Sequence, residues 1–180
     1  RRPVARADTV IVLVNEKPVV RIFGKSDQGK DVCVFYDGYK PYFYAKEEEV
    51  KDHLEGNPYV VSIKKVSRKL VMGYQETRDI YKITLSNPAR TPELRDMLTS
   101  RGITTYEADI LFKYRFMNDL GIKGLGWISV ENGSGVSTET VKTDACIEAK
   151  RIRPIQKIEN APLRMAAFDI ECVSVLPGAM

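Results

Sequence analysis

The first 45 residues contain four short apolar segments separated by tight polar turns, and this pattern constrains the fold more than any other feature of the chain. The segments are rich in β-branched and aromatic side chains, and runs of this length and composition predict β-strands. They cover residues 9–14, 18–24, 31–36 and 41–45. Because turns of a few residues join antiparallel neighbours, the chain is expected to begin with an antiparallel meander.

Three helices are expected among the later strands, and each ends at a glycine. The first begins with acidic residues, which suit the positive N-terminal end of a helix dipole. In the second, Thr91 is expected to be the N-cap and Pro92 to lie in the first turn. The helices and their terminal glycines are residues 46–54 with Gly56, residues 91–100 with Gly102, and residues 109–120 with Gly121.

Alternating side chains predict further strands over residues 59–66, 78–85, 103–106 and 141–149. Antiparallel strands interspersed with short helices predict an α+β fold. The expected organisation is an N-terminal domain over residues 1–150, a proline-containing linker over residues 151–163, and the start of a new unit over residues 164–180.

Composition narrows the class of protein. A chain that is 43% hydrophobic and 29% charged has the balance of a globular protein, and no apolar run approaches the roughly 20 residues that span a bilayer. No signal peptide is recognised at the N-terminus. The three cysteines, Cys33, Cys146 and Cys172, have no metal-ligand spacing and are read as reduced thiols. The single histidine, His53, lies in a charged stretch, which disfavours zinc or serine–histidine chemistry. The net charge of +4 permits contact with phosphates without requiring it.

Two carboxylates lie two residues apart in the apolar run MAAFDIECV. If this run is a strand, Asp169 and Glu171 point to one face, about 6–7 Å apart, and Phe168 and Ile170 point to the other. Such a pair can hold two divalent cations, which suits phosphodiester hydrolysis. Because Asp-x-Glu is short and common, a solvated carboxylate pair is the alternative.

Five segments, in this order, resemble the N-terminal domain and the start of the 3′→5′ exonuclease domain of family B DNA polymerases. They are EKPVVRIFGK, YKPYFYAK, YKITLSNPARTPELRDML, TYEADILFKYRFMNDLGIKGLGWISV and APLRMAAFDIEC. The resemblance implies an RNA-recognition-like unit followed by the first strand of a ribonuclease H-like exonuclease domain. It also implies that Asp169 and Glu171 bind the Mg²⁺ or Mn²⁺ ions of proofreading. EADILFKYRFMND and FDIEC are similar to the eukaryotic delta-type enzyme, but the compact spacing between segments favours an archaeal homologue.

The resemblance further implies the setting of the protein. A replicative polymerase of this family acts on primer-template DNA and single-stranded template, associates with a sliding clamp, and would work in the cytoplasm on chromosomal DNA. The polymerase motifs and the later acidic exonuclease motifs are not found in these 180 residues. The chain by itself is therefore expected to be a monomer that lacks both catalytic activities and requires no cofactor.

Archaeal members of the family capture template uracil with their N-terminal domain. The positions that match that pocket are Pro41, Tyr42, Pro88, Thr91 and Arg115. Two positions depart from the usual pattern, because Thr91 stands where valine is common and Ile11 where a tyrosine is common. The alternative is that the prolines end loops, Tyr42 packs in the core, and Arg115 is a solvated helix residue.

Two further clusters are candidates for contact with nucleic acid. One is a basic run at a strand end, which suits phosphate contact or an exposed solubilising turn, and consists of Lys64, Lys65, Arg68 and Lys69. The other is a group of tyrosines that suits base stacking or core packing, and consists of Tyr36, Tyr39, Tyr42 and Tyr44.

Two other classes of function remain as alternatives. A stand-alone module that binds single-stranded nucleic acid without catalysis would use its sheet as RNA-recognition domains do. A complete small metallonuclease is disfavoured, because few residues follow Glu171 to supply the remaining ligands.

Overall fold

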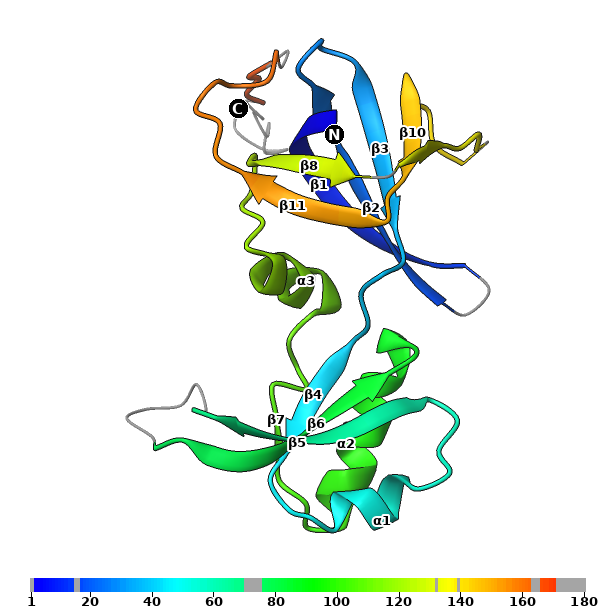
Figure 1. The fold of residues 1–180 in the computed structure, drawn as a ribbon, viewed down its shortest axis with the longest axis vertical. Helices are drawn as coiled ribbons and strands as arrows, with labels where there is room; N and C mark the ends of the chain where they lie inside the picture. The colour runs from blue at the N-terminus through cyan, green and yellow to red at the C-terminus, as the bar shows by residue number, and fades with distance from the viewer. Residues whose placement is uncertain are drawn as a thin grey trace, which may run out of the picture.

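The computed structural model describes residues 2–14, 17–69, 76–131, 133–138, 140–162 and 166–170. The described residues form two sheets, with helix α3 (Phe112–Leu120) between them (Figure 1). The larger sheet has the strand order β11-β8-β1-β2-β3-β10-β9 and the smaller one β5-β6-β4-β7. Mostly antiparallel strands with short helices confirm the predicted α+β class.

The larger sheet is built from two distant parts of the chain. Its strands are β1 (Arg2–Val14), β2 (Lys17–Ser26), β3 (Asp31–Tyr36), β8 (Trp127–Glu131), β9 (Ser134–Gly135), β10 (Ala145–Glu148) and β11 (Arg151–Ile155). β1 shifts register against β2 between Arg6 and Asp8, and its first residues also pair with β8. β10 lies parallel to β3, whereas the other pairings in this sheet are antiparallel.

One face of the larger sheet and helix α3 enclose the first core. In β2 the buried positions alternate with half-buried ones, as expected for a strand with one face inward. Phe112 and Phe116 of α3 pack against this face. The helix ends at Gly121, whose φ of +67° is a left-handed conformation that favours glycine. The sheet residues in this core include Val20, Ile22, Val32, Val34, Ile128, Val130, Ile147 and Ile152.

The smaller sheet belongs to a compact βαββαβ unit. Its elements are β4 (Tyr42–Ala45), α1 (Val50–Leu54), β5 (Val60–Arg68), β6 (Arg78–Leu85), the short helix η1 (Pro88–Arg90), α2 (Thr91–Ser100) and β7 (Thr105–Tyr106). β4 and β7 are neighbours, with Tyr44 opposite Tyr106. This element and strand order agrees with the RNA-recognition-like unit that the resemblance implied.

The second core lies between the smaller sheet and its helices. Phe43, Ile83 and Leu85 on the sheet pack against Leu54 of α1 and the buried leucines of α2. The opposite face of the sheet carries Tyr42, Tyr44, Ile80 and Lys82, and neither α1 nor α2 covers it. This second face is called the open face below.

Several predicted boundaries were wrong. Thr91 is not an N-cap: Asn87 caps η1 by accepting a hydrogen bond from the Ala89 amide at 2.9 Å, and α2 continues directly from η1. α3 begins at Phe112 instead of Asp109. The first five residues of the expected linker form β11, because they pair with β8. The expected four-strand meander ends at β3, since β4 joins the smaller sheet.

Candidate nucleic-acid interface

A pocket of about 590 Å³ lies where the βαββαβ unit meets the start of α3. All five residues that the resemblance assigned to a base pocket line it: Pro41, Tyr42, Pro88, Thr91 and Arg115. They come from three separate segments, namely the start of β4 with the residue before it, the continuous turn from η1 into α2, and α3. The loop before α3 supplies Asp109, Ile110 and Leu111 to the lining. The fold therefore brings the predicted residues together around one cavity.

Backbone hydrogen bonds fix the rim of this pocket. The Pro41 carbonyl accepts a hydrogen bond of 2.8 Å from the Leu85 amide, which ties the start of β4 to the end of β6. The Asn87 cap holds Pro88 at the first turn of η1. Because proline fixes φ and lacks an N–H group, both prolines present rigid surfaces to the cavity.

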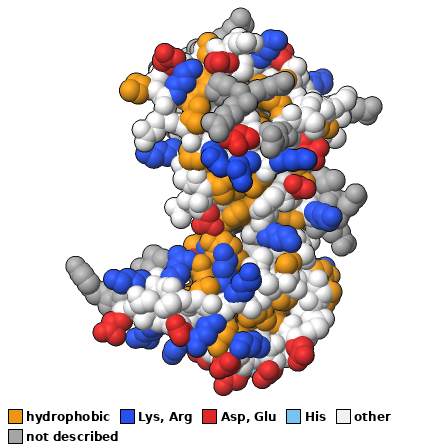
Figure 2. All heavy atoms as spheres, viewed as in Figure 1, with side chains coloured by type: hydrophobic (Ala, Val, Ile, Leu, Met, Phe, Trp, Pro, Cys, Tyr) orange, Lys and Arg blue, Asp and Glu red, His pale blue; other side chains and the backbone are white. Residues whose placement is uncertain are grey.

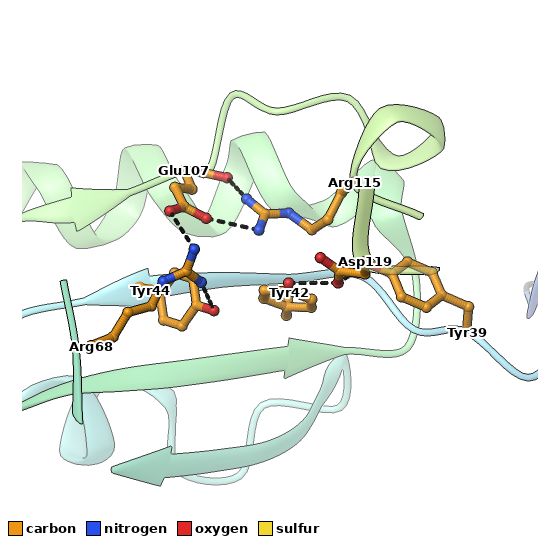
Figure 3. Close-up of polar contacts among 7 residues, drawn as sticks. All are labelled: Tyr39, Tyr42, Tyr44, Arg68, Glu107, Arg115 and Asp119. Carbon is orange, nitrogen blue, oxygen red and sulfur yellow. Dashed lines mark hydrogen bonds and ion pairs between the residues drawn. The ribbon is translucent and has the colours of Figure 1, made fainter. Parts of the chain in front are cut away.

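Tyr42 forms a rigid wall of the pocket (Figure 3). Its hydroxyl donates a hydrogen bond of 2.6 Å to Asp119 Oδ2. Two cations lie over its ring, with Lys82 Nζ 3.6 Å and Arg115 Cζ 4.4 Å from the ring centre. Burial, together with the hydrogen bond to Asp119, raises the pKa of Tyr42 to about 12. At neutral pH the pocket therefore has a protonated, immobilised phenol in its wall.

Arg115 is buried, so the interpretation of it as a solvated helix residue was wrong. Its guanidinium donates hydrogen bonds to Glu107 Oε2 at 2.8 Å and to the Glu107 carbonyl oxygen at 2.7 Å. Glu107 has a φ of +57°, a left-handed conformation that is uncommon outside glycine. This conformation lets the side chain and the carbonyl of Glu107 hold the same guanidinium.

Glu107 also joins α3 to strand β5. Its second carboxylate oxygen, Oε1, lies 3.2 Å from Arg68 Nη2, and Arg68 donates a hydrogen bond to the Tyr44 hydroxyl (Figure 3). The Glu107 side chain is 10% exposed, so the charges are poorly screened by water. The result is a network that runs from β5 through Glu107 to the pocket wall.

The basic run predicted on β5 does not form one surface. Lys65 points toward the helix-covered face and pairs with Asp79 at 3.2 Å. Arg68 is engaged by Glu107. Lys64 lies on the open face directly opposite Lys82 of β6. Lys69 follows the end of the strand and is exposed.

The tyrosine group mainly packs. Tyr42 and Tyr44 are buried, and their rings form an edge-on pair with centroids 5.5 Å apart. Tyr39 contacts Phe112 and Phe116, each with a centroid distance of 5.3 Å. The core-packing alternative therefore describes these rings better than an exposed stacking surface.

Of the predicted metal ligands, Asp169 is described and Glu171 lies outside the described residues. Asp169 is exposed, and its Oδ1 accepts a hydrogen bond of 2.8 Å from the Ile170 amide. Residues 166–170 form no strand, and the side chains of Phe168 and Ile170 are exposed. The strand expected here is not found over residues 166–170. The backbone of a strand needs a neighbouring strand for its hydrogen bonds.

The described segments contain no group of three or more His, Cys, Asp and Glu side chains that could hold a metal ion. Mg²⁺ is usually held by one or two carboxylates, with waters and substrate phosphates completing its six oxygen ligands. Within these segments no helix is both long and apolar enough to cross a bilayer.

Three residues of the site were not identified from the sequence: Lys82, Glu107 and Asp119. Asp119 follows Arg115 by four residues on α3, so both lie on one helix face, and this spacing was a usable signal. Lys82 lies between Tyr81 and Ile83 in an alternating strand, which places it on the face opposite the core. Glu107 carried no local signal, because its role depends on its left-handed backbone.

Comparison with known proteins finds similarity to DNA polymerases. Residues 103–177 match the family model described as DNA polymerase family B, exonuclease domain. The DNA polymerase delta catalytic subunit of Arabidopsis thaliana is 28% identical over 87% of this chain and 18% of its own length. The DNA polymerase catalytic subunit of Murid herpesvirus 1 is 29% identical over 87% of this chain and 16% of its own length.

A solved structure shows the same fold. The family B DNA polymerase from the hyperthermophilic archaeon Pyrobaculum calidifontis superposes with a TM-score of 0.75 and is 24% identical. The superposition covers 91% of this chain and 21% of that structure. The chain spans less than a fifth of the length of the two sequence relatives described above. The chain is therefore similar to family B DNA polymerases in part of its sequence and in its fold, and to DNA polymerase catalytic subunits over most of its length.

Proposed function

We propose that this chain is the template-binding N-terminal region, with the beginning of the exonuclease domain, of a DNA-directed DNA polymerase that proofreads in the 3′→5′ direction. The relatives are polymerase catalytic subunits, and the matched family model is an exonuclease domain. In the longer enzyme, Asp169 and Glu171 would hold the divalent metal ions that activate water and stabilise the leaving oxygen. A sliding clamp as partner, an archaeal origin and a cytoplasmic setting belong to the same proposal.

The pocket is proposed to take a single unstacked base of the template strand. The observation that supports this proposal is that five residues from three separate segments line one cavity of about 590 Å³. A base that leaves the stack needs a snug site with an aromatic or apolar wall and a few fixed polar groups. Tyr42, Pro41 and Pro88 supply the wall.

The preferred base is proposed to be uracil. Uracil and thymine differ by one methyl group, so a tight wall must discriminate by steric exclusion. One rejected methyl is worth roughly 1–3 kcal/mol, or about 10- to 200-fold. Arg115 is held by Glu107, so its part is to fix the Tyr42 wall, and the flanking phosphate needs another cation.

Fluorescence anisotropy with paired oligonucleotides tests this function. The expected result is tighter binding to a single strand that contains one uracil than to the same strand with thymine, at fixed salt. Tyr42→Ala should abolish the preference, whereas Tyr114→Ala, at an exposed tyrosine that does not line the pocket, should keep it. Equal wild-type affinities for the two strands would reject uracil capture.

A further inference from the structure

Two lysines face each other on the open face of the smaller sheet. Lys64 of β5 and Lys82 of β6 are directly opposite in the antiparallel register. Like charges at opposed positions destabilise a sheet. An anion that contacts both lysine side chains would offset this repulsion.

Positive charge exceeds negative charge around this pair. None of the ion pairs found in the described ranges involves Lys64 or Lys82. Two carboxylates of the site are already engaged, Glu107 by two arginines and Asp119 by two tyrosine hydroxyls. Figure 2 shows Lys and Arg side chains gathered over the smaller sheet.

The pKa of Lys82 is consistent with the excess of positive charge around it. Burial lowers the pKa of Lys82, and the nearby cations Arg115, Arg68 and Lys64 lower it further, whereas Asp119 opposes the change. A bound anion would favour the charged ammonium. The position therefore gains more from an anionic ligand than a fully solvated lysine would.

We propose that Lys64 and Lys82 bind a backbone phosphate of a single DNA strand whose neighbouring base occupies the pocket. Tyr42 connects the two sites, because its ring contacts Lys82 and also lines the pocket. The pocket can accept a base only from an unstacked strand, which makes single-stranded DNA the matching ligand. This inference deepens the proposed function and rests on it for the placement of the base.

Lys65 provides a matched control. It is adjacent to Lys64 in the same strand, but it points to the other face and pairs with Asp79. Lys64→Gln and Lys65→Gln remove the same charge from neighbouring positions. A difference in DNA affinity between the two variants therefore shows which face of the sheet binds DNA, because their net charge is the same.

The experiment measures anisotropy of a labelled uracil-containing strand from 50 to 200 mM salt. For single strands the log–log salt slope changes by about 0.7 for each phosphate contact. Lys64→Gln should weaken binding several-fold and reduce the slope by about this amount, with the uracil-to-thymine ratio unchanged. Lys65→Gln should leave the affinity and the salt slope near the wild-type values. Lys82→Gln should reduce the salt slope, whereas Lys82→Arg should retain it.

Equal effects of Lys64→Gln and Lys65→Gln would overturn the proposal. So would displacement of the DNA by polyglutamate at matched charge, because the site would then be a general anion site. If Lys64→Gln weakened the binding of RNA of the same sequence more than the binding of DNA, the assignment to DNA would be overturned. The wild-type protein could also bind both strands equally while Lys64→Gln still reduces the salt slope of binding. That result would reject the base pocket and support the phosphate site.

Discussion

Asp119 Oδ2 accepts a hydrogen bond of 2.6 Å from the Tyr42 hydroxyl, and this contact fixes the wall of the pocket to helix α3. Tyr39 donates to the same oxygen, also at 2.6 Å. The carboxylate therefore joins the segment before β4, β4 itself and α3 at a single atom. Hydrogen bonds to a charged acceptor are worth about 1.5–3 kcal/mol, so this junction contributes substantially to the rigidity of the site.

The first prediction concerns alkaline pH. The pKa of Tyr42 is about 12 in the folded state and about 10 in an unfolded chain. Because the folded-state value is the higher one, the contribution of Tyr42 to stability is complete below pH 10 and is lost as the pH rises to 12. Urea unfolding across this range should show a falling free energy of unfolding. Tyr42→Phe should make the fall less steep, whereas the exposed control Tyr114→Phe should not.

The second prediction concerns the buried ion pair. Glu107→Gln leaves the guanidinium of Arg115, which is 5% exposed, without its carboxylate. Removing one partner of a buried pair costs about 3 kcal/mol or more, so the urea midpoint should fall clearly. Glu93→Gln breaks the exposed pair with Arg90 and should cost less than about 1 kcal/mol. Equal costs would show that the Glu107 network does not stabilise the fold.

A third prediction concerns thiol reactivity. Burial, with a smaller effect from Cys146, raises the pKa of the Cys33 thiol to about 11. The thiolate is the reactive form, so iodoacetamide at pH 8 should leave Cys33 unmodified while it alkylates the half-buried Cys146. Peptide mass spectrometry can follow both sites, with a sample in urea as the control in which both should react. Rapid alkylation of Cys33 in the folded protein would contradict its burial.

The fourth prediction concerns proofreading in the longer enzyme. Asp169→Ala or Glu171→Ala should abolish excision of a mismatched 3′ end and leave primer extension largely intact, because each removes a proposed metal ligand. Excision and extension of labelled primer-template should be measured separately. Wild-type excision in the double variant would reject the metal role. The 180-residue chain should show neither activity with Mg²⁺ and nucleotides.

The fifth prediction concerns the pocket wall. Thr91 lines the cavity, and valine has nearly the same volume but no hydroxyl. Thr91→Val should therefore keep the shape of the wall and raise the preference for uracil over thymine, as measured by paired anisotropy titrations. Thr99→Val, which alters a threonine outside the pocket lining, is the control. A lower preference in Thr91→Val would mean that the hydroxyl contributes to recognition.

Sequence reasoning located the elements well where the pattern was local. The strand predicted at residues 78–85 coincides with β6, and the glycines at 102 and 121 end their helices. Helix starts were less accurate, because the turn η1 displaced the cap from Thr91 to Asn87. The sequence predicts a linker where β11 forms, because local periodicity carries no information about the pairing of β11 with β8.

The candidate site shows the same division. The resemblance supplied the five pocket residues, and the fold places all of them around one cavity. It did not supply the partners Glu107 and Asp119, whose roles depend on a left-handed backbone and on contacts between distant segments. The basic run misled because adjacent lysines in a strand point to opposite faces, and only the register of β5 with β6 reveals Lys82 opposite Lys64.

The adjacency of β4 and β7 means that the chain enters and leaves the βαββαβ unit at neighbouring strands. This is the topology of an inserted domain, whose two ends lie close together. The unit is continuous in sequence and relies on local contacts, whereas the larger sheet must join strands from both ends of the described chain. We therefore expect the insert to fold early and to draw the two halves of its host sheet together, because local contacts cost less loop-closure entropy.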